Sequence, residues 1–166
     1  MSDSTGRPDG LQAWTELSAT VDAIRVAINR DLQTEVGLTL ADNLVLCRVA
    51  MAPGKRLRMV EIASGLNIAK SAVTKTVDRL EQRGLLTRGR DPGDRRTVYA
   101  SLTSEGQKVF EAARPSFVTS VDRHFTRHLD PAQIRALHQL GAGALAPGPP
   151  AGRPDRLRRD GERGPR

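Results

Sequence analysis

The chain has 166 residues, of which 38% are hydrophobic, 27% are charged and 3% are aromatic, and its formal net charge is +7. This apolar content suffices for one domain with a modest core, and apolar runs of only a few residues exclude a membrane span. Three His and one Cys, with no Gly-rich phosphate loop and no Cys-x-x-Cys set, argue against an enzyme and against a bound cofactor.

Positive charge is concentrated in one part of the chain. Residues 55–96 hold 11 Lys and Arg against 5 Asp and Glu, whereas residues 1–54 hold 4 against 7. A second excess, 6 against 3, lies in residues 146–166. A general preference for arginine, here 22 Arg to 4 Lys, accounts for the residue type but not for its placement. The uneven distribution indicates a polyanionic partner, and we expect double-stranded DNA.

The first third of the chain predicts two helices. Residues 1–10 are polar and expected to be disordered; we find no signal or transit peptide there and expect a cytoplasmic protein. Apolar residues then recur every three or four positions, which predicts an amphipathic helix over 11–36 that Gly37 ends. This stripe comprises Leu11, Trp14, Leu17, Val21, Ile24, Ile28 and Leu32. Thr39 begins a second helix, in which Asp42 completes a capping box and which Pro53-Gly54 closes.

The next segment predicts a helix-turn-helix. A very short strand at Leu57-Arg58 precedes a third helix over 59–66, and Asn67 suits the left-handed corner between two helices. Residues 70–83 predict a fourth helix with Gly84 as its C-cap. The positions expected to face inward are Val73, Val77 and Leu80.

A β-hairpin is predicted directly after this fourth helix. Leu85-Leu86 and the alternating Val98, Ala100 and Leu102 flank a Pro92-Gly93 turn. The hairpin projects the arginines Arg88, Arg90, Arg95 and Arg96. A helix-turn-helix followed by a basic hairpin predicts a winged helix.

The C-terminal third predicts two helices and a tail. Ser104-Glu105-Gly106 opens a long helix whose apolar positions continue to Leu129, and Pro115 is expected to kink or fray it. Asp130-Pro131 predicts an N-cap and first residue of a last helix. Residues 146–166 are rich in Gly, Pro and Arg and are expected to be disordered.

Several short motifs occur in this order. They are Gly-Leu-Thr-Leu at 37–40, Arg79-Leu80-Glu81, Arg83-Gly84-Leu85, Asp94-Arg95-Arg96, Leu102-Thr103 and Ser104-Glu105-Gly106. With this spacing, the chain from about residue 11 to residue 140 resembles the MarR family of bacterial winged helix-turn-helix transcription regulators.

The resemblance implies a mainly α (α+β) fold with the order α-α-(β)-α-α-β-β-α-α. It implies a DNA-binding lobe over 37–103 and a homodimer joined through a helix at 11–36 and helices at 104–145. It also implies repression at a pseudo-palindromic operator, controlled by a small aromatic or phenolic ligand that binds between the dimer region and the DNA-binding lobe.

The fourth helix and the hairpin carry the expected DNA contacts. Ser71, Thr74 and Lys75 are expected to reach base edges in the major groove, and Lys70 and Arg79 to hold phosphates. By the family's D-x-R pattern, Arg96 is expected in the minor groove with Asp94 orienting it. Phosphate contacts are expected from Arg88, Arg90 and Arg95.

Some of these side chains have structural alternatives. Ser71 is also placed to cap its helix, and Thr74 to be a solvated surface residue. Arg79 is also placed to form an ion pair with Asp78, Glu81 or Glu105.

Four residues raise the question of sensing. Trp14 is expected in the dimer core, with a ligand pocket as the alternative. Cys47 reads as a small buried hydrophobe rather than a redox sensor. His124 and His128 lie four apart, a spacing that supplies two metal ligands, with Asp122 or His138 as a third; two imidazoles of this kind are more often surface or interface residues.

A second class of function competes with that of a specific regulator. An architectural or nucleoid-type protein would coat DNA through charge and use the basic tail as a nonspecific arm. The hydroxyl-bearing fourth helix and the single defined hairpin favour the specific regulator.

Overall fold

The computed structural model describes residues 9–90, 93 and 96–144. The chain divides into two units after His128, which are described separately. The first unit contains α1 (Gly10–Val36), α2 (Leu40–Ala50), the 3-10 turn η1 (Pro53–Lys55), β1 (Arg56–Arg58), α3 (Met59–Leu66), α4 (Lys70–Gln82), β2 (Leu86–Arg90), β3 (Val98–Leu102), α5 (Ser104–His124) and η2 (Thr126–His128). The second unit contains α6 (Pro131–Ala144). This order confirms the predicted fold class, and no helix in the described ranges is long and apolar enough to cross a membrane.

Local signals set the limits of α1 and α2. The Asp9 carboxylate accepts hydrogen bonds from the first turn of α1, and Gly37 ends that helix at φ +65°. The capping box of α2 is confirmed, because the Thr39 hydroxyl accepts from the Asp42 N–H at 3.0 Å and the Asp42 carboxylate accepts from the Thr39 N–H at 3.0 Å. α2 ends at Ala50, before the predicted stop, and residues 53–55 form η1 instead.

The helix-turn-helix follows the prediction closely. α3 has the predicted bounds, and Asn67 adopts the left-handed conformation at φ 51° and ψ 46°. α4 buries Val73, Val77 and Leu80 completely, as predicted. The helix ends at Gln82, with Arg83 rather than Gly84 at the C-cap. Gly84 makes the reversal that follows, at φ +70°.

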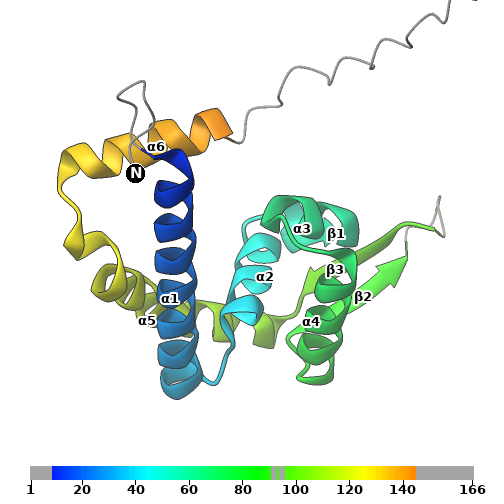
Figure 1. Ribbon diagram of the computed structural model, residues 1–166. Helices are drawn as coiled ribbons and strands as arrows, with labels where there is room; N and C mark the ends of the chain where they lie inside the picture. The colour runs from blue at the N-terminus through cyan, green and yellow to red at the C-terminus, as the bar shows by residue number, and fades with distance from the viewer. Residues whose placement is uncertain (1–8, 91–92, 94–95, 145–166) are drawn as a thin grey trace, which may run out of the picture. The chain divides into compact units, whose positions relative to one another are not determined.

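The hairpin and the short strand form one antiparallel sheet in the order β1-β3-β2. Leu57 lies opposite Ala100, and Arg90 lies opposite Val98. Both predicted hairpin strands are therefore confirmed, while the Pro92 turn lies outside the described residues. Figure 1 shows the hairpin extending past α4, away from α1 and α5.

Two hydrophobic clusters meet along α5. The larger one fills the winged helix with Leu38, Leu46, Ile62, Leu80, Leu86, Ala100 and Ala113 among its members. The smaller one packs α1 against the second half of α5 through Ile28, Leu32, Phe117 and Val121. Because α5 contributes to both clusters, it joins the winged helix to α1.

Two sequence predictions concern α5. The helix continues across Pro115 without fraying, while a kink at that residue stays a prediction. Both Pro115 and Glu111, whose carbonyl lacks the usual donor from proline, are exposed, so water can replace that bond. The helix ends at His124 rather than near Leu129, and the Asp122 carboxylate accepts from the hydroxyl of Thr126 at 2.9 Å in the turn that follows.

The restart at Asp130 is confirmed. Its carboxylate accepts from the N–H groups of Ala132 and Gln133, and the Gln133 side chain accepts from the Asp130 N–H at 2.8 Å. This reciprocal cap begins α6 at Pro131.

A polar cluster joins α1 to α5 around the mostly buried Asp31. Its Oδ2 atom accepts from Ser120 Oγ at 2.8 Å and from Arg123 Nη1 at 3.0 Å, and lies 2.8 Å from His124 Nε2. The hydrogen bond from Ser120, followed by that from His124, holds the pKa of Asp31 below its usual value of 3.8.

The Asp31 cluster predicts a pH-dependent contribution to stability. Because its pKa is lowered by folding, the Asp31 carboxylate stabilises the fold above pH 3.8, and this contribution is lost as the pH falls through the folded-state value. We expect Asp31→Asn to lower the free energy of unfolding at neutral pH, with the difference from wild type shrinking below about pH 4. Urea melts at a series of pH values measure this. Asp22→Asn, an exposed position on α1, is the control.

Candidate nucleic-acid interface

α4 is amphipathic: one face is buried in the core and the outward face is polar. Ser71, Thr74 and Lys75 are exposed, as predicted for side chains that reach base edges. Ser71 lies inside the helix and the N-cap is Ala69, so the alternative that Ser71 caps α4 is wrong. The Thr74 hydroxyl donates to the Lys70 carbonyl at 3.0 Å and leaves its oxygen lone pairs available as acceptors.

A groove of about 670 Å³ opens between the start of α3, the start of α4 and the hairpin. Its lining brings together five predicted contact residues, Lys70, Thr74, Arg88, Arg90 and Arg96. Met59, Val60 and Val98 supply apolar lining. Ser71, Lys75 and Arg79 are not part of this lining, although all three are exposed on α4.

The groove also contains a cation that the sequence did not single out. Arg58, the last residue of β1, is exposed and lines the groove with Lys70 and the hairpin arginines. Its Nε donates to the Tyr99 hydroxyl at 3.3 Å, and the neighbouring Arg56 stacks 3.7 Å from the centre of the Tyr99 ring. The available signal was a basic residue directly before the first helix of the helix-turn-helix, where winged-helix proteins meet the DNA backbone.

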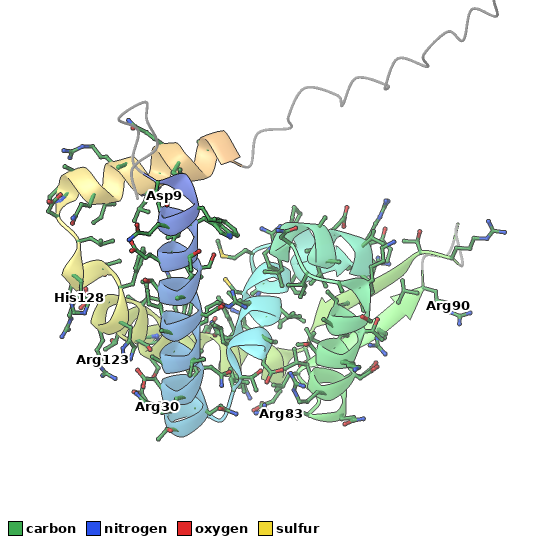
Figure 2. All side chains as sticks on the ribbon, in the orientation of Figure 1. Asp9, Arg30, Arg83, Arg90, Arg123 and His128 are labelled. Atoms are coloured by element: carbon green, nitrogen blue, oxygen red, sulfur yellow. The ribbon has the colours of Figure 1, made fainter. Side chains whose placement is uncertain are left out.

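The hairpin places two predicted cations at its far end. Arg90 closes β2, and Figure 2 shows its side chain at the end of the hairpin furthest from α1. Arg96 is exposed just before β3. Asp94 and Arg95 lie outside the described residues, so the orientation of Arg96 by Asp94 stays a prediction.

Arg88 is held against α4. Its guanidinium forms an ion pair with Asp78, lies 3.6 Å from a Glu81 carboxylate oxygen, and donates to the Thr74 carbonyl at 3.1 Å. Its backbone N–H also donates to Glu81 at 3.0 Å. These bonds fix the hairpin on α4, so Arg88 has a structural task in addition to any contact with phosphate.

Arg79 forms an ion pair, but not with the expected partners. Its Nη2 lies 2.6 Å from Oδ1 of Asp42 and its Nε donates to the same oxygen at 3.0 Å. The Asp42 side chain is 2% exposed and that of Arg79 is 44% exposed. Asp42 caps α2, so this bond connects α4 to the start of a different helix rather than to Asp78, Glu81 or Glu105.

The comparisons with known proteins agree with this geometry. Residues 38–98 match the model of the MarR family. The transcriptional regulator HosA of Escherichia coli O111:H- is 33% identical over 62% of this chain and 74% of its own length. The chain belongs to the MarR family.

Two other similar proteins match over different shares of their length. An uncharacterised HTH-type transcriptional regulator of Bacillus subtilis, YkoM, is 35% identical over 42% of this chain, and the match spans 45% of YkoM. The crystal structure of Sco3205, a MarR-family transcriptional regulator from Streptomyces coelicolor in complex with DNA, is 28% identical with a TM-score of 0.76. The match covers 85% of this chain and 93% of the Sco3205 chain. The protein is thus a DNA-binding transcriptional regulator of the MarR family and not an enzyme.

The histidines considered as candidate metal ligands lie apart from this interface. Figure 2 shows Arg123 and His128 on the side of the first unit opposite Arg90. His124 is bonded to Asp31, while His128 Nε2 lies 3.0 Å from the Arg123 carbonyl oxygen. Within the described ranges, no three His, Cys, Asp or Glu side chains are grouped to hold a metal ion. The described residues therefore do not bring a third metal ligand to His124 and His128.

Cys47 is partly exposed rather than buried. It lies on α2, where the nearby residues Leu46 and Val49 are completely buried. The helical periodicity of the apolar residues predicted that Cys47 is buried with them. In the structure, Cys47 lies at the edge of the buried face of α2.

Proposed function

We propose that this protein is a homodimeric, sequence-specific regulator that binds a pseudo-palindromic operator and represses transcription by occupying a promoter. The observation that carries the proposal is the groove in which cations from β1, α4 and the hairpin converge beside the exposed polar face of α4. Five basic side chains, Arg58, Lys70, Arg88, Arg90 and Arg96, line it. Such a set matches a nucleic-acid backbone, while the adjacent hydroxyl-bearing helix supplies groups for reading bases.

Each part of the lobe has a proposed place on the duplex. α4 enters the major groove, where Ser71, Thr74 and Lys75 meet base edges. Arg96 enters the minor groove from the hairpin, with Asp94 orienting it and Arg95 on a phosphate. Lys70 and Arg90 contact phosphates between these two grooves. Arg58 is added to the phosphate contacts because it lines the same groove of the protein.

Exposed apolar side chains support the homodimer. The first half of α1 exposes Leu11 by 74%, Trp14 by 66%, Leu17 by 40% and Val21 by 44%, and α5 exposes Val118 by 59%. Large apolar side chains grouped along one helix mark an interface. A second copy that covers this face would pair two α4 helices and read half-sites about 34 Å apart.

A small aromatic or phenolic ligand is the proposed inducer. It would act by binding one spacing of the two α4 helices more tightly than another, since equal affinity for both shifts no equilibrium. Trp14 is exposed in the single chain. We propose that it packs in the dimer core, with a place in the wall of the ligand site as the alternative.

Selection of binding sequences from a random duplex library tests the proposed function. We expect a pseudo-palindrome that the protein prefers over random DNA by about 10³-fold or more at physiological salt. Sedimentation is expected to give twice the chain mass of 18.0 kDa. A preference near one would instead support the architectural protein, and a stable monomer that binds the operator would contradict the dimer.

Lys70→Ala separates phosphate contact from base reading. We expect it to weaken binding to operator and random DNA alike and to lower the slope of log affinity against log salt by about one. Fluorescence anisotropy at several salt concentrations measures both quantities. Lys108→Ala removes the same charge from α5, outside the groove, and is expected to leave the slope close to the wild-type value.

A further inference from the structure

We propose that Asp42 and Arg79 form a positioning pair that sets the orientation of α4, and that Arg79 acts on operator binding through this orientation rather than by holding a phosphate. The inference rests on the proposed function, since it assumes that α4 reads an operator. It assigns a role in DNA recognition to Asp42, a buried residue of a helix that does not line the groove.

The two oxygens of the Asp42 carboxylate have different tasks. Oδ2 accepts from the Thr39 N–H and so belongs to the cap of α2. Oδ1 accepts from both Nε and Nη2 of Arg79. The cap fixes the carboxylate relative to α2, and the two bonds to one edge of the guanidinium then fix Arg79 relative to the carboxylate. Nη2 also lies 3.4 Å from the Thr39 hydroxyl oxygen.

Burial makes this pair costly to exchange for a phosphate. The Asp42 carboxylate is almost completely buried, and a buried charge that loses its partner is strongly unfavourable. Turning Arg79 toward a phosphate would remove two donors from that carboxylate. An exposed cation such as Lys70 can meet a phosphate without breaking a buried ion pair, so the DNA backbone has better partners than Arg79 in the same lobe.

A second bond ties α4 to the same corner of the chain. Arg83 Nη1 donates to the carbonyl of Gly37 at 3.1 Å, one helical turn beyond Arg79. Figure 2 shows Arg83 at the end of α4 that lies nearest to the turn between α1 and α2. Gly37 is the C-cap of α1 and Thr39 is the N-cap of α2. The C-terminal half of α4 is therefore bonded to the point where the proposed dimerisation helix α1 ends.

The test compares affinity and salt dependence for four full-length proteins: wild type, Arg79→Gln, Asp42→Asn and the double variant. A positioning pair predicts that Arg79→Gln and Asp42→Asn each lower affinity for the selected operator by about tenfold or more. It predicts that the salt slope and the affinity for random duplex stay near wild type. The double variant is expected to lose little more than either single one, because both break the same interaction.

A phosphate contact predicts a different result. Arg79→Gln would then lower the salt slope by about one on both DNAs, as the matched variant Arg90→Gln is expected to do. Asp42→Asn would leave operator binding unchanged or strengthen it by releasing Arg79. Either outcome would overturn the positioning role.

Two further measurements keep the result interpretable. Arg79→Lys retains the charge but not the two-pronged bond, so a positioning pair predicts an operator affinity well below wild type, whereas a simple phosphate contact predicts near-complete rescue. If Asp42→Asn does not fold by circular dichroism, the salt slopes of the two Arg79 variants still decide. Failure of the proposed function is seen separately, as a wild-type protein with no preference for any sequence.

Discussion

Gly106→Ala is expected to destabilise the protein by about 3 kcal/mol, at the upper end of the range for overpacked sites. Gly106 lies in the first turn of α5 and is buried. A Cβ atom there would overlap the backbone carbonyl oxygen of Leu85 and lie 2.9 Å from Leu102 Cδ1. The backbone cannot swing aside as a side chain does. Alanine normally stabilises a helix relative to glycine by about 1 kcal/mol, so the packing reverses the usual sign.

The site of this overlap is the junction between the hairpin and α5. The Leu85 carbonyl accepts from both the N–H and the hydroxyl of Thr103, and the same hydroxyl accepts from the Gly106 N–H at 2.9 Å. An added methyl group would disturb the carbonyl, the cap of α5 and the first residues of β2 together. Urea denaturation followed by circular dichroism measures the loss.

Gly65→Ala is the matched control for this prediction. Gly65 also lies within a helix, but the three atoms nearest to its added Cβ would all belong to the guanidinium end of Arg48. That exposed side chain can move, so we expect unchanged or slightly raised stability. A Gly106→Ala protein as stable as wild type would show that α5 and the hairpin do not pack as described.

Arg96→Ala is expected to weaken operator binding by about 1–3 kcal/mol, or roughly 5- to 150-fold. The exposed side chain of Arg96 lines the groove near the far end of the hairpin. A guanidinium in a narrow minor groove experiences the deepest negative potential of the duplex, so its removal costs more than that of a phosphate contact. Anisotropy titrations with the selected operator measure the change.

Groove width supplies the internal control for Arg96. If Arg96 lies in the minor groove, operators with an A-tract at the contacted position should bind wild type more tightly than operators with G·C pairs there. Arg96→Ala should remove most of this difference, whereas Lys70→Ala should preserve it. An Arg96→Ala protein that keeps the full A-tract preference would place the hairpin elsewhere.

Local sequence signals predicted most of the fold. The capping residues Thr39, Asn67 and Asp130 predicted the starts and ends of elements because caps act within a few residues of chain. The burial of Val73, Val77 and Leu80 followed from helical periodicity. The end of α5 did not, because the apolar spacing continues to Leu129 while the Asp122 side chain bonds to the turn that replaces the helix.

The interface was harder to predict where long-range contacts decide it. Arg79 has acidic neighbours in sequence, yet its partner Asp42 lies 37 residues earlier and meets it only in the folded lobe. Arg88 was assigned to phosphate, but the geometry adds three bonds to α4. Arg58 was assigned only to a strand. Its position directly before α3 was a weak local signal, and only the folded structure shows that β1 borders the same groove as α4.

Cleavage of DNA by an iron chelate tethered to the protein tests the central claim most directly. Cys47 is the single cysteine, so Cys47→Ser gives a background in which Gly93→Cys or Ser71→Cys carries the chelate. If α4 lies in the major groove and the hairpin in the minor groove, the Gly93 chelate should cut both strands with the 3′ offset of minor-groove attack. The Ser71 chelate should cut at the half-site centre with the major-groove pattern, and both patterns should repeat about one helical turn away. Even cleavage along the operator from both positions, or the same groove pattern from both, would contradict this mode of binding.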